Sequence, residues 1–201
     1  MPTINIAERE IICKLVYYGP GLGGKTTNIQ YLHKTAHPKF RGELVSIATE
    51  TDRTLFFDFL PMAVKKIGGF TLRFHLFTVP GQVIYEESRK IVLKGADGVV
   101  FVADSQADRR LANEESLEDM TRNLALYRLD IRTIPRVMQY NKRDVENPIP
   151  LDDMRYMLNY LKVPEFEAVA VRGEGVIETF KEISRLVLTR IQEKIRGVGG
   201  E

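Results

Sequence analysis

A glycine-rich run near the N-terminus constrains this chain more than any other feature. Residues 19–26 read Gly-Pro-Gly-Leu-Gly-Gly-Lys-Thr and match the pattern G-x-x-x-x-G-K-[ST]. Glycines let backbone N–H groups approach a phosphate chain closely, at a helix N-terminus whose dipole favours anions. Lys25 is expected to contact the β- and γ-phosphates, and the Thr26 hydroxyl to bind Mg²⁺. The run predicts a nucleoside phosphate ligand held by Gly19, Gly21, Leu22, Gly23, Gly24, Lys25, Thr26 and Thr27.

The surroundings of this run decide between a phosphate loop and an ordinary glycine-rich turn with an accidental lysine. A phosphate loop needs a strand before it and a helix after it. Residues 11–18 are rich in β-branched and aromatic side chains, which predicts a strand, and residues 26–36 are expected to form a helix that ends before Pro38. Both requirements are met, so we favour the phosphate loop.

The rest of the chain alternates between segments typical of strands and segments typical of helices. Strands are expected at 55–60, 70–79, 98–104, 135–140 and 166–171, and helices at 114–129, 152–161 and 177–195. A turn expected at 66–69 makes the first two of these strands an antiparallel hairpin. The alternation predicts an α/β sandwich around a mostly parallel sheet with one antiparallel edge strand. Ligands bind such sheets beyond the carboxyl ends of the strands.

Composition excludes several classes of protein. The 201 residues are 44% hydrophobic and 28% charged, which suits one globular domain over 1–201, and we expect a flexible tail from about residue 196. The net charge of +2 is too mild to indicate direct nucleic-acid binding. The single cysteine, Cys13, cannot form a disulfide within the chain. No signal peptide, lipidation motif or membrane-spanning run is evident, so a cytoplasmic protein without an intrinsic membrane anchor is expected.

A second motif follows the strand expected at 135–140. Residues 141–144 read Asn-Lys-Arg-Asp. The carboxylate of Asp144 could accept two parallel hydrogen bonds from the ring N–H and the exocyclic amine of guanine, whereas adenine has no such paired donors on that edge. Taken alone, this segment could equally be a polar loop cap. Downstream of a phosphate loop it predicts guanine recognition by Asn141, Lys142 and Asp144.

With both motifs in place, the chain resembles the Ras-like small GTPases over nearly its whole length. The resemblance implies a three-layer P-loop GTPase fold and a guanine-nucleotide switch that binds GTP or GDP with Mg²⁺. Gly81 and Gln82 match the glycine and the catalytic glutamine of switch II in that family. Ala170, within Ala-Val-Ala-Val at 168–171, matches the alanine of the last guanine-contact loop.

Within that superfamily the chain is similar to the bacterial gliding-motility (Mgl-type) GTPases. Three runs carry the likeness: residues 19–27, Thr-Asp-Arg-Thr-Leu-Phe-Phe-Asp at 51–58, and Phe-Thr-Val-Pro-Gly-Gln at 77–82. Thr78 replaces the aspartate that normally holds Mg²⁺ through water, a departure that the Mgl type shares. The resemblance implies a cell-polarity and motility switch in rod-shaped bacteria, concentrated at the cell poles. Its partners would be a roadblock-domain GTPase-activating protein and effectors that read switch I and switch II.

Three residues are candidates for the reaction itself. Gln82 could orient the attacking water. Thr54 is the best candidate for the switch I threonine that closes on Mg²⁺ and the γ-phosphate, with Thr49 and Thr51 as rivals. Arg53 could stabilise transition-state charge from within the same chain, as an arginine finger in cis. The alternative for Arg53 is an exposed arginine on an edge strand.

Other features favour or oppose competing functions. A pseudo-GTPase scaffold without turnover is supported by Thr78 and opposed by the candidates for hydrolysis, and an ATP-dependent phosphotransferase is opposed by Asp144. No metal-ligand spacing is found among His33, His37 and His75, so zinc is not expected. The acidic residues of the helix expected at 114–129 should form a solvated face: Glu114, Glu115, Glu118 and Asp119. The aromatic run at 55–60 either presents one face to a partner or is covered on both faces by the protein itself.

Overall fold

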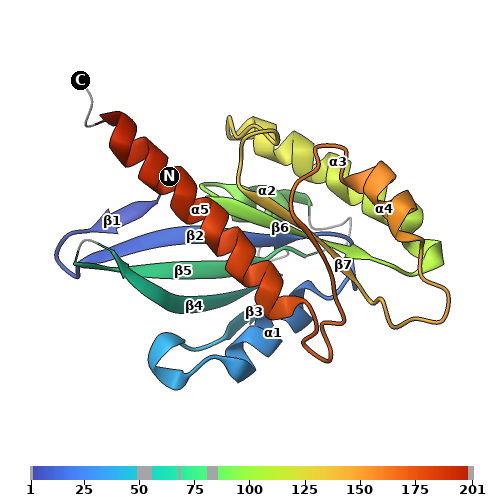
Figure 1. Ribbon diagram of the computed structural model, residues 1–201, viewed down its shortest axis with the longest axis horizontal. Helices are drawn as coiled ribbons and strands as arrows, with labels where there is room; N and C mark the ends of the chain where they lie inside the picture. The colour runs from blue at the N-terminus through green and yellow to red at the C-terminus, as the bar shows by residue number, and fades with distance from the viewer. Residues whose placement is uncertain (1, 49–55, 68, 81–85, 199–201) are drawn as a thin grey trace.

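The computed structural model describes the backbone of residues 2–48, 56–67, 69–80 and 86–198. Within these ranges, the side chains of 46–48, 56–58, 64–67, 86 and 194–198 are not described. In this part of the chain, one sheet of eight strands has helices on both of its faces (Figure 1).

The sheet runs in the order β3-β4-β5-β2-β6-β7-β8, with β1 paired to β2 off this path. Strands β5, β2, β6, β7 and β8 are parallel, and β4 runs antiparallel to β5. The predicted α/β class with a mostly parallel sheet is confirmed. The strands are β1 (Thr3–Asn5), β2 (Glu10–Tyr18), β3 (Val45–Ala48), β4 (Phe56–Ile67), β5 (Phe70–Thr78), β6 (Gly98–Asp104), β7 (Arg136–Asn141) and β8 (Glu165–Glu167).

Two apolar clusters, one on each face, hold the layers together. Alternate side chains of β2 point to opposite faces. Leu15 and Tyr17 pack with α1 and α5, whereas Val16 and Tyr18 pack with α2, α3 and α4. Figure 1 shows α5 crossing one face of the sheet. The helices are α1 (Lys25–Thr35), α2 (Glu86–Leu93), α3 (Arg110–Leu126), α4 (Leu151–Leu158) and α5 (Val176–Val198), with short 3-10 helices η1 (Pro38–Phe40) and η3 (Ala107–Arg109).

The antiparallel hairpin differs from the prediction in its extent. β4 continues to Ile67, so part of the turn expected at 66–69 belongs to the strand, because β4 pairs with β5 up to Ile67 and Phe70. β3 was not predicted from the sequence; it lies outside β4 in the sheet and pairs with it antiparallel. In β4, Leu60 is fully buried and the Phe59 ring lies 4.9 Å from that of Phe77. The side chains of 55–58 lie outside the described ones, so the fate of the aromatic run's other face stays a prediction.

Other boundaries shift for identifiable local reasons. The strand expected at 166–171 ends at Glu167, because pairing with β7 stops there and the chain turns back, with the Val169 N–H bonded to the Glu174 carbonyl at 3.1 Å. The helix expected at 152–161 ends at Leu158, since Asn159 leaves helical geometry and its side chain bonds to the backbone of Val163. α3 begins at Arg110 instead of 114, and α2 was not predicted. α5 reaches Val198, and residues 199–201 of the predicted flexible tail lie outside the described ones.

The burial of titratable side chains in β2 should make the fold less stable at alkaline pH. Cys13 is fully buried, and this burial, with the nearby Asp97 carboxylate, raises the pKa of its thiol from 9.0 to about 12. Burial also raises the pKa of the Tyr17 and Tyr18 hydroxyls above their ordinary value of 10.0. Burial lowers the pKa of Lys14, so the titration of this lysine changes the free energy of unfolding in the opposite direction.

We therefore expect the free energy of unfolding to fall as the pH rises from 8 to 10.5. Above pH 9 the unfolded chain loses these protons while the folded chain keeps them, so deprotonation favours the unfolded state. The loss should be about 2 kcal/mol, because the lowered pKa of Lys14 offsets only part of the effect of the raised pKa values of Cys13, Tyr17 and Tyr18. Urea unfolding followed by circular dichroism at several pH values measures it. A free energy of unfolding that is flat or rising over this range would contradict the expectation.

Candidate nucleotide-binding site

The glycine-rich loop joins the carboxyl end of β2 to the start of α1, as the sequence predicts for a phosphate loop. Gly19 and Gly24 have φ of +140° and +97°, a region that favours glycine. A Cβ on Gly19 would lie 2.1 Å from the Val102 carbonyl oxygen, and one on Gly24 would lie 2.1 Å from Asn141 Nδ2. Both positions therefore require glycine, because the loop packs directly against β6 and against the residue that ends β7.

Lys25 holds a positive charge inside this loop. Its side chain is buried, and its Nζ donates to the carbonyl oxygens of Gly19 at 2.9 Å and Pro20 at 2.6 Å. The N-cap of α1 is Gly24, which has no side chain to satisfy the first-turn N–H groups, and no acidic residue lies in that turn. Thr26 is exposed in the same turn. Backbone donors, a cation and a hydroxyl close together suit a polyphosphate and its metal ion.

The Asn141 side chain connects the phosphate loop to the base-recognition loops. Its Nδ2 donates to the Gly23 carbonyl at 2.8 Å, and its Oδ1 accepts from the Ala170 N–H at 2.9 Å. Asn141 is almost fully buried. One amide therefore fixes three segments that are far apart in the sequence.

Two charged residues of the second motif, Lys142 and Asp144, are the ones expected to recognise guanine. Lys142 adopts a left-handed φ of +63°, and its Nζ bonds to Asp104 Oδ2 at 2.6 Å and Gln106 Oε1 at 3.1 Å. Asp144 Oδ2 lies 3.2 Å from Arg172 NH2, and its side chain is 28% exposed. The Asp144 carboxylate is thus held at an accessible corner by an arginine from the loop that follows Ala170.

Of the other predicted site residues, Thr78 lies at the end of β5, and several lie outside the residues that the structure describes. Thr78 ends β5 beside Tyr17 of β2 and is buried. Arg53, Thr54, Gly81 and Gln82 lie outside the described residues, as do the rivals Thr49 and Thr51. Among the described residues, no group of three or more His, Cys, Asp or Glu side chains could hold a metal ion.

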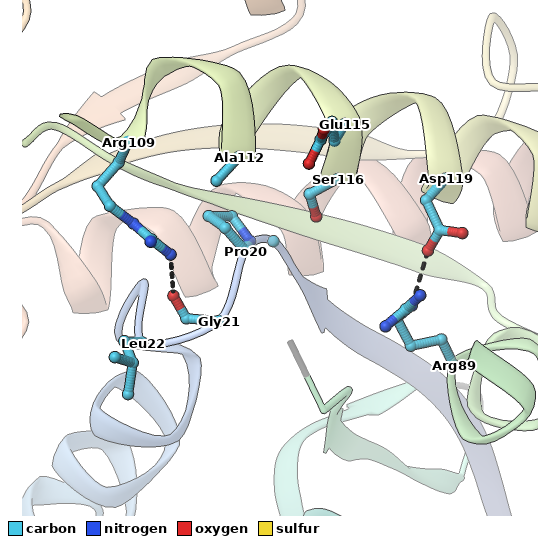
Figure 2. A pocket seen from close by; sticks show the side chains of 10 residues that line it. Pro20, Gly21, Leu22, Arg89, Arg109, Ala112, Glu115, Ser116 and Asp119 are labelled. Atoms are coloured by element: carbon cyan, nitrogen blue, oxygen red, sulfur yellow. Dashed lines mark hydrogen bonds and ion pairs between the residues drawn. The ribbon is translucent and has the colours of Figure 1, made fainter. Parts of the chain in front are cut away.

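A cleft of about 410 Å³ lies on the outer side of the phosphate loop, between the loop, α2 and α3 (Figure 2). Arg89 Nε donates to Asp119 Oδ2 at 2.7 Å, and the Tyr18 hydroxyl donates to the same oxygen. The prediction of a wholly solvated acidic face on α3 was therefore wrong for Asp119, which binds partners from β2 and α2. The lining residues are Gly19, Pro20, Gly21, Leu22, Arg89, Arg109, Ala112, Glu115, Ser116 and Asp119.

Comparison with known proteins agrees with this geometry. The sequence model of the ADP-ribosylation factor family matches residues 6–187. The chain belongs to the Arf/Ras-like small GTPases. This GTPase is also 55% identical over 193 residues to the mutual gliding-motility protein MglA of Myxococcus xanthus (strain DK1622), covering 96% of this chain and 99% of that protein. The family resemblance inferred from the motifs is confirmed. Among the described residues, no helix is long and apolar enough to cross a membrane.

Several contacts of this GTPase could not be expected from the motifs. Asp104, Gln106 and Arg172 contact the base-recognition residues, and Arg109 contacts the phosphate loop. The only sequence signal for any of them was the position of Asp104 at the end of the apolar run 98–104, beside the expected ligand edge of the sheet.

Proposed function

We propose that this GTPase is a molecular switch that binds GTP or GDP with Mg²⁺ and hydrolyses GTP to GDP and phosphate. The observation that carries the proposal is the pair of hydrogen bonds at the Asn141 side chain, which donates to the Gly23 carbonyl and accepts from the Ala170 N–H. Through them, the phosphate loop and the predicted guanine-recognition residues meet at one corner of the sheet. A nucleotide that spans this corner is bound at its phosphates and at its base by one rigid frame.

The predicted site residues divide the binding between them. Lys25 and the backbone N–H groups of residues 19 and 21–27 bind the phosphates, and Asp144 accepts two hydrogen bonds from guanine. Lys142 and Ala170 complete the base site. The hydroxyls of Thr26 and Thr54 would hold Mg²⁺, which would supply positive charge that neutralises the phosphates.

Hydrolysis requires positioning and charge neutralisation more than covalent chemistry by the protein. Gln82 orients a water that attacks the γ-phosphorus, and the bond from that phosphorus to the bridging oxygen of GDP breaks. Arg53 stabilises the negative charge of the transition state from within the same chain. An activating protein then has only to order switch I, without supplying an arginine of its own.

A second candidate function is a scaffold that binds guanine nucleotide without significant turnover. Thr78 favours it, because the switch II strand ends on a buried hydroxyl side chain where Ras-like proteins carry a magnesium-holding aspartate. We prefer the hydrolysing switch, because Gln82 and Arg53 occupy matching motif positions.

The cellular role follows the similar protein from Myxococcus xanthus, whose name assigns it to gliding motility. We propose that this GTPase controls cell polarity and motility in a bacterium. It would act in the cytoplasm, concentrated at the cell poles, without binding nucleic acid directly. Its partners would be a roadblock-domain activating protein, which makes the slow hydrolysis faster, and effectors that read switch I and switch II.

Nucleotide binding tests the proposal without requiring a partner. Displacement of a fluorescent GDP analogue in the presence of Mg²⁺ should give an affinity for GDP at least about 1,000-fold higher than for ADP, since adenine lacks the paired donors for Asp144. Lys25→Ala should lose binding of both nucleotides. Equal affinities of the wild-type protein for GDP and ADP would contradict guanine recognition.

A further inference from the structure

A buried carboxylate links the base-recognition loop to a second cation. The Asp104 side chain is fully buried at the end of β6. Its Oδ2 accepts from Lys142 Nζ at 2.6 Å and lies 3.8 Å from Arg109 Nε, while its Oδ1 accepts from the Gln106 N–H at 3.1 Å. A buried carboxylate needs this compensation, because removing it from water is costly.

The guanidinium of Arg109 extends this link to the phosphate loop. Its NH2 donates to the Gly21 carbonyl oxygen at 2.7 Å (Figure 2), a contact between residues 88 positions apart in the chain. The planar guanidinium carries several donors in a fixed arrangement, so Arg109 can face Asp104 and Gly21 at the same time. Its own backbone is held by the hydrogen bond from Arg109 N–H to the Gln106 carbonyl at 3.0 Å.

The tip of the phosphate loop needs restraint from outside. Leu22 follows Gly21, is 86% exposed and has a left-handed φ of +64°, which a bulky L side chain rarely adopts. Within the loop, the Gly23 N–H reaches the Pro20 carbonyl at 3.3 Å, a long hydrogen bond. The shorter, charge-assisted hydrogen bond from Arg109 is therefore well placed to fix this tip.

We propose that Arg109 is a positioning residue for nucleotide binding. Through the chain of contacts Lys142–Asp104–Arg109–Gly21, it holds the phosphate loop at a fixed place relative to the base-recognition loop. The inference rests on the proposed function, because it assumes that the loop binds phosphates. The contact between Arg109 and Gly21 affects phosphate binding and not base binding. Loss of Arg109 therefore weakens the binding of nucleotides that carry a β-phosphate.

The test compares GDP with GMP, which keeps the base and lacks the β-phosphate. For Arg109→Ala we expect GDP affinity about tenfold lower than in the wild type, with faster GDP release, and GMP affinity within about twofold. The matched control is Arg110→Ala. That neighbouring arginine pairs with Asp153 on α4 at 2.8 Å, its side chain is 46% exposed, and its loss should leave both affinities unchanged.

A conservative variant guards against loss of folding in Arg109→Ala. Arg109→Lys keeps the positive charge, but a single ammonium cannot replace both contacts, so GDP affinity should fall about threefold or more, again with GMP unaffected. Thermal melting shows whether each variant is folded. Unchanged GDP affinity in the folded variants, or equal losses for GDP and GMP, would overturn the inference. Wild-type protein that binds neither nucleotide would instead contradict the proposed function.

Discussion

Replacing Asp144 with asparagine should move the base preference of this GTPase from guanine to xanthine nucleotides. The carboxylate that accepts two hydrogen bonds from guanine becomes an amide, which can donate to the additional carbonyl of xanthine and no longer accepts both N–H groups. Loss of two hydrogen bonds to a charged group should lower GDP affinity about 100-fold or more. Competition of GDP and XDP against a fluorescent nucleotide measures the change.

Two controls separate base recognition from loss of a structural ion pair. Asp144 pairs with Arg172 at 3.2 Å, so Arg172→Ala removes that contact and should keep the preference for guanine. Asp153→Asn neutralises an aspartate on α4 whose side chain is 48% exposed, and it should change neither affinity. If Asp144→Asn kept the wild-type preference for GDP over XDP, the assignment of the base site would be wrong.

Arg53→Ala should lower partner-stimulated GTP hydrolysis about 1,000-fold, because an arginine finger typically contributes a factor of this size or more. GDP affinity should remain within a few fold of the wild type, since Arg53 acts on the transition state and not on the bound nucleotide. Single-turnover hydrolysis with the activating protein present, together with nucleotide binding, measures both quantities.

The matched control is Arg122→Ala, which removes an exposed arginine on α3. Its stimulated rate should equal that of the wild type. A near-normal stimulated rate in Arg53→Ala would mean that the transition-state charge is stabilised by another group, such as an arginine of the activating protein. That result would exclude the arginine finger in cis.

Local sequence signals predicted most elements of the fold. The apolar run 98–104 is β6 without any change of boundary, because a strand buried on both faces is continuously apolar. Val45–Ala48 forms β3 through pairing with β4, and four residues give too short a pattern to recognise. β4 extends through Ile67 because its pairing with β5 overrides the local turn signal at 66–69, and this pairing is not visible in the local sequence.

The site could be predicted at its motifs and not at the contacts between them. The spacing of glycines and lysine predicts Gly24 and Lys25 in the loop, because phosphate binding needs close backbone N–H groups and a cation at those positions. No spacing relates Gly24 to Asn141 or Gly21 to Arg109, because these pairs meet only when β2, β6 and β7 lie side by side. Asp119 was misjudged for a related reason. Helical spacing alone does not reveal that β2 and α2 each present a hydrogen-bond donor to it.

Single-turnover hydrolysis of GTP and of ATP, with Mg²⁺ and with or without a roadblock-domain activating protein, is the sharpest test of whether this GTPase is a hydrolysing switch. We expect slow hydrolysis of GTP alone, much faster hydrolysis when the activating protein is present, and no hydrolysis of ATP. Tight GTP binding with no turnover, even with the activating protein present, would contradict the switch and favour the scaffold.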